Sequence, residues 1–311
     1  MKLRDLGEGG LIRYIRERFG ARTGQLPVGI GDDAAVIDFP EDSSLVFCSD
    51  AVVENTHFIR NLHPPASIGY KAVAVNVSDV GAMGGTPMHF LISLAATPDL
   101  DWVWLQGFFQ GVETACDRFE VSLAGGDTST SDRIFIDVCM VGRVPRGQAV
   151  RRTGAKPGDG IYITGTLGSS ALGLELLKAG QTDDAAVQRH LFPEPRHKIG
   201  ATVAPMAHAM MDISDGLSTD LTHILEESQV SARIYKDRLP VFPAAEDHHV
   251  LHGGEEYELI IIAPQLHLPP SIDGIPLSLI GEIVESGIEH QAFLIAGSQE
   301  EVLHPRGWQH F

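Results

Sequence analysis

The sequence predicts an α+β fold in two domains, and three observations support this. The chain has 311 residues, and a domain usually has roughly 100–200 residues. Helical and strand-like patterns occur in both halves but do not alternate strictly as in βαβ units. The stretch 151–160 (RRTGAKPGDG) contains Gly and Pro and lacks large apolar residues. It marks a boundary between a domain over 1–150 and a domain over 151–311.

The first domain shows apolar periods that fit both helices and strands. Apolar residues at helical spacing predict helices at 8–19, at 66–83 and from Asp101 onward. Short apolar runs predict strands at 45–50 and 89–96.

A further strand is predicted at 133–144, and it is apolar on both faces. One face carries Ile134, Ile136, Val138 and Met140, and the other carries Phe135, Cys139 and Val141. One face can therefore cover the sheet of a second copy, which favours a homodimer.

The second domain repeats the mixture of helices and strands. Apolar spacing predicts helices at 168–179 and 215–228, and Ser214 or Asp215 is suited to cap the second of these. Strands are predicted at 161–164, 209–214, 231–235, 257–263 and 277–284.

The composition excludes several classes of partner. Acidic residues number 41 against 23 basic residues, which gives a formal net charge of −18. Such a surface repels phosphate backbones and anionic lipid, so neither nucleic acid nor membrane is an expected partner. No apolar run is long enough to span a bilayer, and the start MKLRDLGEGG does not have the pattern of a signal peptide. With only three cysteines, the sequence predicts a soluble, cytoplasmic protein.

Carboxylates recur beside Gly, Ser or Thr where apolar elements end or are interrupted. They are Asp32, Asp33, Asp50, Asp79, Asp127, Asp212 and Asp215. A single Asp in such a place usually caps a helix or forms a turn. Asp79, however, lies inside an apolar helix with Asn76 one turn earlier, where an unpaired buried carboxylate would be costly. Oxygen ligands without His or Cys are those that Mg²⁺ prefers, and pairing with arginines is the alternative.

Common nucleotide-binding and metal motifs are absent. The chain has no Walker A sequence, no protein-kinase signature and no HExxH. GTLGSS (165–170) and the glycine pairs at 125–126 and 253–254 could let backbone N–H groups approach a phosphate. Each of these signals is weak alone, because most glycine pairs only form turns.

Seven motifs, in order, resemble the thiamine-monophosphate kinase family. They are GIGDDAAV, SDAVVENTHF, YKAVAVNVSDVGAMGGTP, GGDTS, RRTGAKPGDGIYITGTLG, MDISDGLSTDL and HGGEEYEL. The family belongs to a superfamily with aminoimidazole ribonucleotide synthetase. The resemblance implies an N-terminal ATP-binding domain whose mixed sheet pairs in a homodimer, and a C-terminal α/β domain that completes the substrate site.

The resemblance also implies roles for individual residues. The implied Mg²⁺ ligands are Asp33, Ser49, Asp50, Asp79, Asp127, Asp212 and Asp215. The implied ATP contacts are Gly126, Asp127, Arg152, Ser214 and Phe109. The implied contacts to thiamine monophosphate are His57, Glu255 and Trp308. Arg152 and Asp212 would act through charge and metal binding, and no residue would act as a nucleophile.

The activity that the resemblance implies is ATP-dependent phosphorylation of thiamine monophosphate to thiamine diphosphate. Two alternatives stay open: another enzyme of the superfamily, such as an aminoimidazole ribonucleotide synthetase, and a non-catalytic nucleotide or cation sensor. The sequence departs from the family pattern at two positions. Cys48 stands where Ser or Thr is common, and Glu256 stands in GGEEYEL where Asp is commoner.

Overall fold

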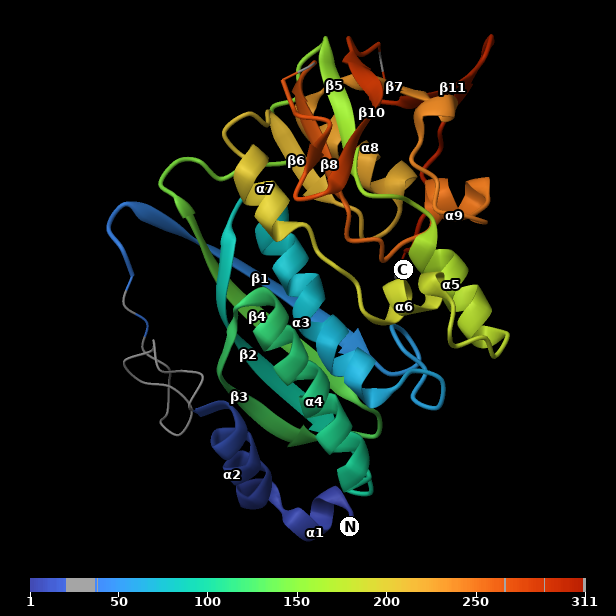
Figure 1. Ribbon diagram of the computed structural model, residues 1–311. Coiled ribbons are helices and arrows are strands. Elements are labelled where there is room, and N and C mark those ends of the chain that lie inside the picture. The colour runs from blue at the N-terminus through green and yellow to red at the C-terminus, as the bar shows by residue number, and fades with distance from the viewer. Residues whose placement is uncertain (21–36, 38, 266, 288, 310–311) are drawn as a thin grey trace. The chain divides into compact units, whose positions relative to one another are not determined.

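The computed structural model describes residues 1–20, 37, 39–265, 267–287 and 289–309 (Figure 1). The chain divides into two compact units, one of Met1–Val80 and Thr86–Gly147, the other of Gly81–Gly85 and Gln148–Phe311. Each unit contains helices and a sheet with both parallel and antiparallel pairs. The predicted α+β class is therefore confirmed.

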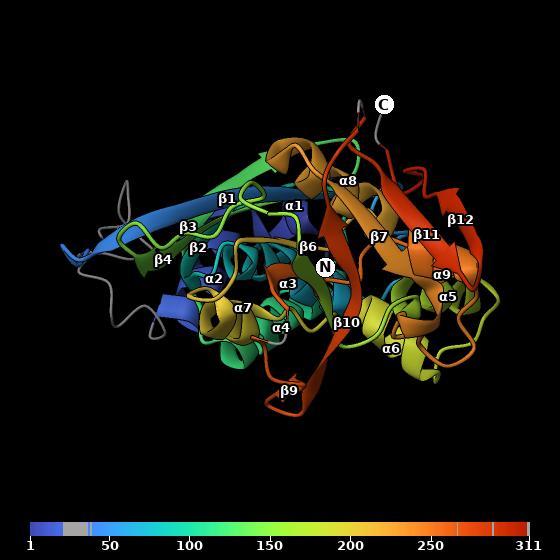
Figure 2. The same cartoon turned by 90° about the horizontal axis from the view of Figure 1, so that it is seen from above.

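The first unit is built on a four-stranded sheet in the order β1-β4-β2-β3. Its strands are β1 (Ser43–Val53), β2 (Thr86–Ala96), β3 (Ser122–Thr130) and β4 (Phe135–Pro145). The strands β2 and β3 are parallel, and the other neighbours are antiparallel. Its helices are α1 (Leu3–Leu6), α2 (Glu8–Phe19), α3 (Pro65–Ala82) and α4 (Trp102–Phe119). Figures 1 and 2 show α3 and α4 side by side along one face of the sheet.

The two faces of this sheet differ in what covers them. On β4, Ile136, Val138 and Met140 are fully buried, as expected for the face that carries the helices. The opposite face exposes four large apolar side chains, and the register places all four on that face. Their exposed fractions are 44% for Leu45, 65% for Phe47, 42% for Leu91 and 38% for Phe135. This face is an apolar surface that no described part of the first unit covers.

Two glycines let α3 and α4 approach each other closely. A Cβ atom at Gly69 would overlap the carbonyl oxygen of Phe108, and a Cβ atom at Gly111 would overlap the carbonyl oxygen of Ala66. Both obstacles are backbone atoms, which cannot rotate away. The spacing of the two helices therefore depends on these glycines.

The second unit is built on a larger sheet with the order β12-β11-β7-β10-β5-β8-β6 and a short β9 beside β10. Its strands are β5 (Asp159–Thr164), β6 (Ala209–Asp212), β7 (Ser231–Tyr235), β8 (Leu259–Pro264), β9 (Ser271–Ile272), β10 (Ile275–Val284), β11 (Ala292–Ala296) and β12 (Gln299–Val302). Its helices are α5 (Ser169–Lys178), α6 (Ala185–Leu191), α7 (His197–Val203), α8 (Leu217–Ser228) and α9 (Asp247–His252), with a 3₁₀ turn at Lys236–Arg238.

Both faces of the second sheet are covered by apolar clusters. One cluster joins α8 and α9 to the sheet through residues such as Leu221, Ile224 and Val250. The other joins α7 to the opposite face through Ile199 and Val203. This double cover explains why β5 and β8 read as continuous apolar runs rather than alternating ones.

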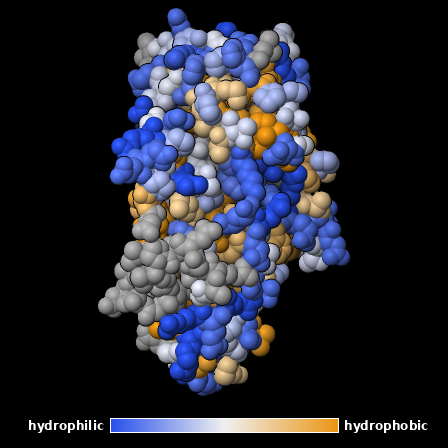
Figure 3. Space-filling view, turned by 60° about the vertical axis from the view of Figure 1, so that its left-hand side comes forward, coloured by the Kyte–Doolittle hydropathy of each residue, from blue (hydrophilic) through white to orange (hydrophobic). Residues whose placement is uncertain are grey.

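The surface matches the composition. Figure 3 shows a face that is largely hydrophilic, with scattered hydrophobic patches. Among the described residues, no helix has the length and apolar composition that crossing a membrane requires.

We expect Gly111→Ala to lower the free energy of unfolding by about 1–3 kcal/mol, because the added methyl group must push α3 and α4 apart. Gly9→Ala is the matched control, since Gly9 is also helical and a Cβ there meets nothing within 4 Å. That control should raise the free energy of unfolding by up to about 1 kcal/mol, because Ala favours a helix over Gly. Chemical denaturation measures both variants. Equal stability of Gly111→Ala and the wild type would contradict the close packing.

Candidate functional site

Asp50 and Asp79 gather around Cys48 in the first unit. The Cys48 Sγ atom lies 3.4 Å from the Asn76 carbonyl oxygen and 3.6 Å from Asn76 Oδ1, so it points toward α3. Asp50 follows Cys48 by two residues in β1 and shares its face. Asp79 follows Asn76 by three residues in α3, which places it on the same side of the helix. Two of the predicted carboxylates are thereby brought together.

The electrostatics around Cys48 show how much negative charge meets here. Burial raises the pKa of the Cys48 thiol well above its usual range, and the charges of Asp79 and Asp50 and a hydrogen bond to Asp79 raise it further. A neutral thiol is a poor ligand for a hard cation. The carboxylates, rather than Cys48, are the donors that suit Mg²⁺ here.

Ser49 lies on the opposite face of β1, as strand alternation requires. Its hydroxyl donates to Asp137 Oδ1 at 2.9 Å. The register pairs Asp137 with Ser93, and Ser93 with Asp127. Ser49, Asp137, Ser93 and Asp127 therefore form a polar row across the face that also exposes Phe47. The structure does not bring the Ser49 side chain or Asp127 to the face of Asp50.

Asp137 was not predicted as part of any site. The signal in the sequence is that it interrupts an apolar face of its strand, between Phe135 and Cys139. The packing of β3 against β2 requires glycine at position 126, because a Cβ atom there would overlap the carbonyl oxygen of Ile92. Asp33 lies outside the described residues.

Phe109 is a core residue of α4. Its ring centroid lies 5.2 Å from that of Phe108, 5.9 Å from that of Tyr14 and 6.0 Å from that of Phe19. It is fully buried in this aromatic cluster. We therefore leave Phe109 out of the proposed contacts to adenine.

His57 lies in the loop after β1 with one tautomer fixed. Its Nδ1 atom accepts the backbone N–H of Val53 at 3.0 Å. A neutral ring with an acceptor at Nδ1 carries its hydrogen at Nε2. His57 can therefore donate a hydrogen bond from Nε2, which is the role a contact to a phosphate oxygen requires.

In the second unit, the predicted residues meet at the loop between β6 and α8. Asp212 ends β6 and is buried, and Ser214 and Asp215 follow in the loop. The backbone N–H groups of Ser214, Asp215 and Gly216 all donate to Asp220 Oδ2, each at 3.0 Å. Asp220 lies on the first turn of α8 and therefore fixes the conformation of this loop.

Asp220 was missed by the sequence reasoning. Burial raises its pKa to about 8, the charges of Asp212 and Asp215 add to this, and the backbone hydrogen bonds oppose it. Its Oδ1 atom is buried and has no hydrogen-bond partner among the described residues. The signal was its place on the apolar face of α8, beside Leu217 and Leu221.

Glu255 and Trp308 are both tied to this loop by backbone hydrogen bonds. The N–H of Glu255 donates to the Ser214 carbonyl oxygen at 2.7 Å, and the N–H of Trp308 donates to the Asp215 carbonyl oxygen at 3.0 Å. Glu255 has a left-handed backbone with φ of 61°. Such conformations are strained for residues other than Gly and are often found at functional sites. Four predicted residues of the second unit are thus brought together: Ser214, Asp215, Glu255 and Trp308.

Arg152 is not brought to that loop by the described contacts. Its carbonyl oxygen accepts the hydroxyl of Ser228, the last residue of α8. The loop of Ser214 lies at the first residue of α8, and this helix of 12 residues is about 18 Å long. The Arg152 side chain is exposed.

Two family descriptions match most of the chain. AIR synthase related protein, N-terminal domain, matches residues 31–144, and AIR synthase related protein, C-terminal domain, matches residues 156–290. The thiamine-monophosphate kinase of Escherichia coli (strain K12) is 37% identical over 325 residues, which cover 98% of both chains. That of Aquifex aeolicus (strain VF5) is 35% identical over 326 residues and covers 100% of both. This chain belongs to the thiamine-monophosphate kinase family.

Solved structures of the thiamine-monophosphate kinase family share the fold. The enzyme of Stenotrophomonas maltophilia K279a has a TM-score of 0.82 at 32% identity, covering 90% of this chain and 95% of that one. AaThiL complexed with AMPPCP and TMP has a TM-score of 0.79 at 34% identity, covering 100% and 99%. Hydrogenase maturation protein HypE in complex with ATP has a TM-score of 0.80 at only 22% identity, and therefore shows the fold alone.

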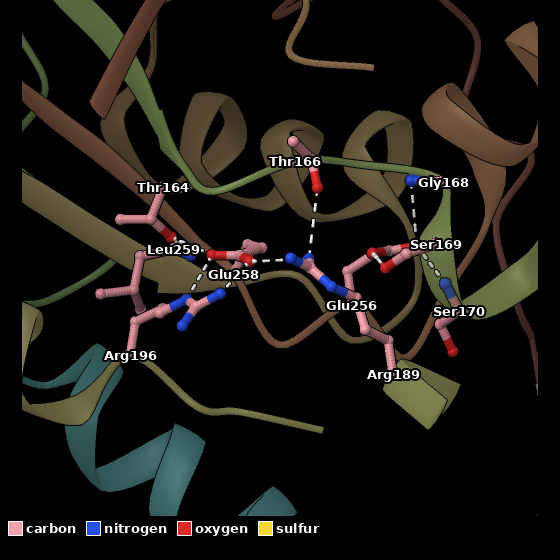
Figure 4. A network of polar contacts seen from close by, with 10 residues as sticks. All are labelled: Thr164, Thr166, Gly168, Ser169, Ser170, Arg189, Arg196, Glu256, Glu258 and Leu259. Carbon is pink, nitrogen blue, oxygen red and sulfur yellow. Dashed lines mark hydrogen bonds and ion pairs between the residues drawn. The ribbon is translucent and has the colours of Figure 1, made fainter. Parts of the chain in front are cut away.

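The family motif HGGEEYEL carries two buried glutamates that bind different partners (Figure 4). Glu256 accepts the N–H groups of Gly168 and Ser170, at 3.0 and 2.9 Å, and the hydroxyl of Ser169 at 2.8 Å. Two backbone N–H groups of GTLGSS, a segment that could have approached a phosphate, therefore bind Glu256 instead. Glu256 therefore reaches three donors at the start of α5.

Glu258 forms a bidentate ion pair with Arg196, with distances of 2.7 Å to Nε and 2.6 Å to Nη2. The hydroxyl of Thr164 also donates to Glu258, at 2.6 Å. Figure 4 shows these donors converging on the carboxylate. Both glutamates thereby fix the segment that presents Glu255.

The histidine-rich stretch before this motif has a structural explanation. Donor atoms of Glu175, His248 and His249 lie within 4.8 Å of one another, as a metal site would require. However, the N–H of Glu246 donates to His249 Nδ1 at 3.0 Å, so the hydrogen of the neutral ring is at Nε2. That atom lies 3.2 Å from Glu175 Oε2. Because a metal needs a deprotonated nitrogen, the cluster is better explained as a link between α9 and α5.

We expect Glu256→Gln to flatten the pH dependence of stability between about pH 4.5 and pH 7. Burial, with a smaller contribution from Glu258, raises the pKa of Glu256 from 4.5 to about 7. In that window the folded protein binds more protons than the unfolded chain, so stability falls as pH rises. Denaturation curves across the window measure the change. Glu301→Gln, at an exposed position of β12, is the control, and an unchanged slope in Glu256→Gln would refute the assignment.

Proposed function

We propose that this chain is a Mg²⁺-dependent kinase that transfers the γ-phosphoryl group of ATP to thiamine monophosphate, giving thiamine diphosphate and ADP. The observation that carries this is full-length similarity, at 34–37% identity, to thiamine-monophosphate kinases. It includes a structure complexed with AMPPCP, an analogue of ATP, and TMP. ATP and thiamine monophosphate are therefore the proposed substrates.

The donor groups fit Mg²⁺ in both units. Asp50 and Asp79 lie together in the first unit, and Asp212 and Asp215 lie together in the second. All four are oxygen donors, which are the ligands that Mg²⁺ prefers. We propose Asp50, Asp79, Asp212 and Asp215 as ligands of several Mg²⁺ ions. When bound, these ions would neutralise the phosphates of both substrates.

Phosphoryl transfer requires the side chains mainly to position charges around the reacting phosphates. An oxygen of the acceptor phosphate monoester is already ionised near neutral pH, so no general base has to deprotonate it. The residues align the two phosphates and stabilise the charge of the transition state. We assign Arg152 to the ATP phosphates, because its side chain is exposed and permanently charged. Ser214 is assigned to ATP as well.

Three residues are proposed to hold thiamine monophosphate. His57 can donate from Nε2 to a phosphate oxygen, because Nδ1 already accepts the Val53 N–H. Glu255 and Trp308 are fixed to the same loop. The indole of Trp308 is about half exposed, and an indole face attracts a cationic thiazolium ring by roughly 0.5–2 kcal/mol.

The test is incubation of the chain with ATP, Mg²⁺ and thiamine monophosphate, followed by detection of thiamine diphosphate. We expect formation with the wild type, and loss of more than about a hundredfold in kcat with Asp50→Asn, because a proposed Mg²⁺ ligand is lost. Asp50→Asn should remain folded, since one of the repelling charges near Asp79 is removed.

Asp132→Asn is the matched control for this prediction, because Asp132 is a strongly exposed carboxylate of the same unit. It should leave kcat unchanged. Thiamine diphosphate formation by Asp50→Asn within threefold of the wild type at saturating Mg²⁺ would remove Asp50 from the proposed ligands. Absence of product with the wild type would overturn the proposed function itself.

We further propose that the chain is a homodimer formed by the apolar face of the first sheet. This face exposes Leu45, Phe47, Leu91 and Phe135. A two-fold axis would pair the same face of two copies, which is the commonest form of soluble assembly. The polar row of Ser49, Asp137, Ser93 and Asp127 crosses this face and would supply its hydrogen-bonding groups.

Phe47→Asp should convert the dimer to a monomer, because it places a charge in the centre of an apolar contact. Sedimentation at micromolar concentration should give about twice the 33.6 kDa chain mass for the wild type and the single mass for the variant. Val103→Asp is the control, since Val103 is exposed on α4, away from this sheet face. A monomeric wild type, or dissociation by Val103→Asp as well, would contradict the proposal.

A further inference from the structure

Asp220 occupies a set of backbone donors that would otherwise bind an anion. The three successive N–H groups of Ser214, Asp215 and Gly216 converge on its Oδ2 atom, each at 3.0 Å. Convergent backbone N–H groups of this kind form anion-binding concavities. Here the donors bind the protein's own carboxyl group, that of Asp220, which is fully buried. These donors are therefore not available to a phosphate of ATP.

On its other sides the loop is held by backbone hydrogen bonds. The Ser214 carbonyl oxygen accepts the N–H of Glu255, and the Asp215 carbonyl oxygen accepts the N–H of Trp308. A Cβ atom at Gly216 would approach the His252 carbonyl oxygen to 2.7 Å, so the chain also passes close to α9. The side chain of Asp220 binds the loop by accepting three of the loop's backbone N–H groups.

We propose that Asp220 is a positioning residue of the phosphoryl-transfer reaction. By accepting three N–H groups it holds the loop in the shape that directs the side chains of Ser214 and Asp215 outward, and it leaves Ser214 to contact ATP through its hydroxyl. This inference rests on the proposed function for the roles of Ser214 and Asp215. It assigns Asp220 no contact with substrate.

An ordinary capping role does not account for the arrangement. A helix cap satisfies one or two N–H groups of the helix it begins, whereas the donors here belong to the preceding loop. The second oxygen, Oδ1, is buried without a hydrogen-bond partner among the described residues, and such an orphan carries an energetic cost. This energetic cost occurs beside the loop that carries two proposed site residues, Ser214 and Asp215.

Two substitutions separate hydrogen bonding from charge. Asp220→Asn keeps one oxygen that can accept the three N–H groups. Asp220→Leu keeps the branched shape, at a larger volume, and removes the acceptor. We expect kcat at saturating ATP, thiamine monophosphate and Mg²⁺ to stay within about tenfold of the wild type for Asp220→Asn. For Asp220→Leu we expect a fall of about a hundredfold, the size that a displacement of roughly 1 Å produces.

Asp184→Leu is the matched control, because Asp184 also binds a backbone N–H, that of Ala186 at 2.7 Å, at the start of α6. It should lower the melting temperature and leave kcat unchanged. If Asp220→Leu behaves in the same way, Asp220 only stabilises the fold and the proposal is overturned. It is also overturned if Asp220→Asn loses more than tenfold in kcat, and this arm remains decisive where Asp220→Leu fails to fold.

Amide hydrogen exchange tests the placement of the loop without any assay of activity. The N–H groups of residues 214–216 should exchange at least tenfold faster in Asp220→Leu than in the wild type, and at a similar rate in Asp220→Asn. Exchange in β8 should be unchanged. Unaltered protection of the loop in Asp220→Leu refutes the positioning role. A wild type that makes no thiamine diphosphate refutes the proposed function instead.

Discussion

Repulsion between carboxylates is the constraint on which the rest of this structure depends. The chain carries a net charge of −18, yet it buries acidic side chains in both units. Each buried acid has its own means of compensation. Glu258 binds the guanidinium of Arg196, and Glu256 and Asp220 each accept several hydrogen bonds. Asp50 and Asp79 instead lie near each other around a neutral thiol, which is the arrangement that a bound cation would stabilise.

The loop between β6 and α8 is the meeting point of four segments of the second unit. It receives hydrogen bonds from Glu255 and Trp308, and it donates to Asp220. The left-handed backbone of Glu255 and Tyr257 costs on the order of 1–3 kcal/mol per residue. Tyr257 and Glu255 donate to the carbonyl oxygens of Ile213 and Ser214, so hydrogen bonds to the loop after β6 offset part of that strain. The two residues with left-handed backbone are thus both tied down by backbone hydrogen bonds.

The sequence predicted most of this fold because apolar periods are local. The helix predicted at 8–19 is α2, and the one predicted at 66–83 is α3 within one residue at each end. Strand β3 was not predicted, because Gly125 and Gly126 weaken the strand pattern and its second half is polar. The helices α6 and α9 were missed as well, since each has two turns or fewer and little apolar periodicity.

The site was predicted less completely for a physical reason. Asp215 and Glu255 were recognised because they lie in motifs. Asp220 lies in the same motif as Asp215, but its position on the apolar face of α8 gave no sign that it binds the preceding loop. Arg196 acts through a contact 62 residues away, which no local pattern displays. Alternation along β1 does show that Ser49 and Asp50 face opposite ways. What pairs with Ser49 could not be read locally, because Asp137 is 88 residues away.

The apolar face of the first sheet has a consequence during synthesis of the chain. The last strand of that sheet ends at Pro145. All four strands with this apolar face are therefore synthesised before most of the second unit. In the proposed dimer a second copy covers this surface, and before assembly an exposed apolar surface of this kind favours misassociation. The carboxylate of Asp137 lies on the inner strand β4 of this face, and that of Asp127 lies on the edge strand β3. Charges within an apolar strand surface disfavour aggregation.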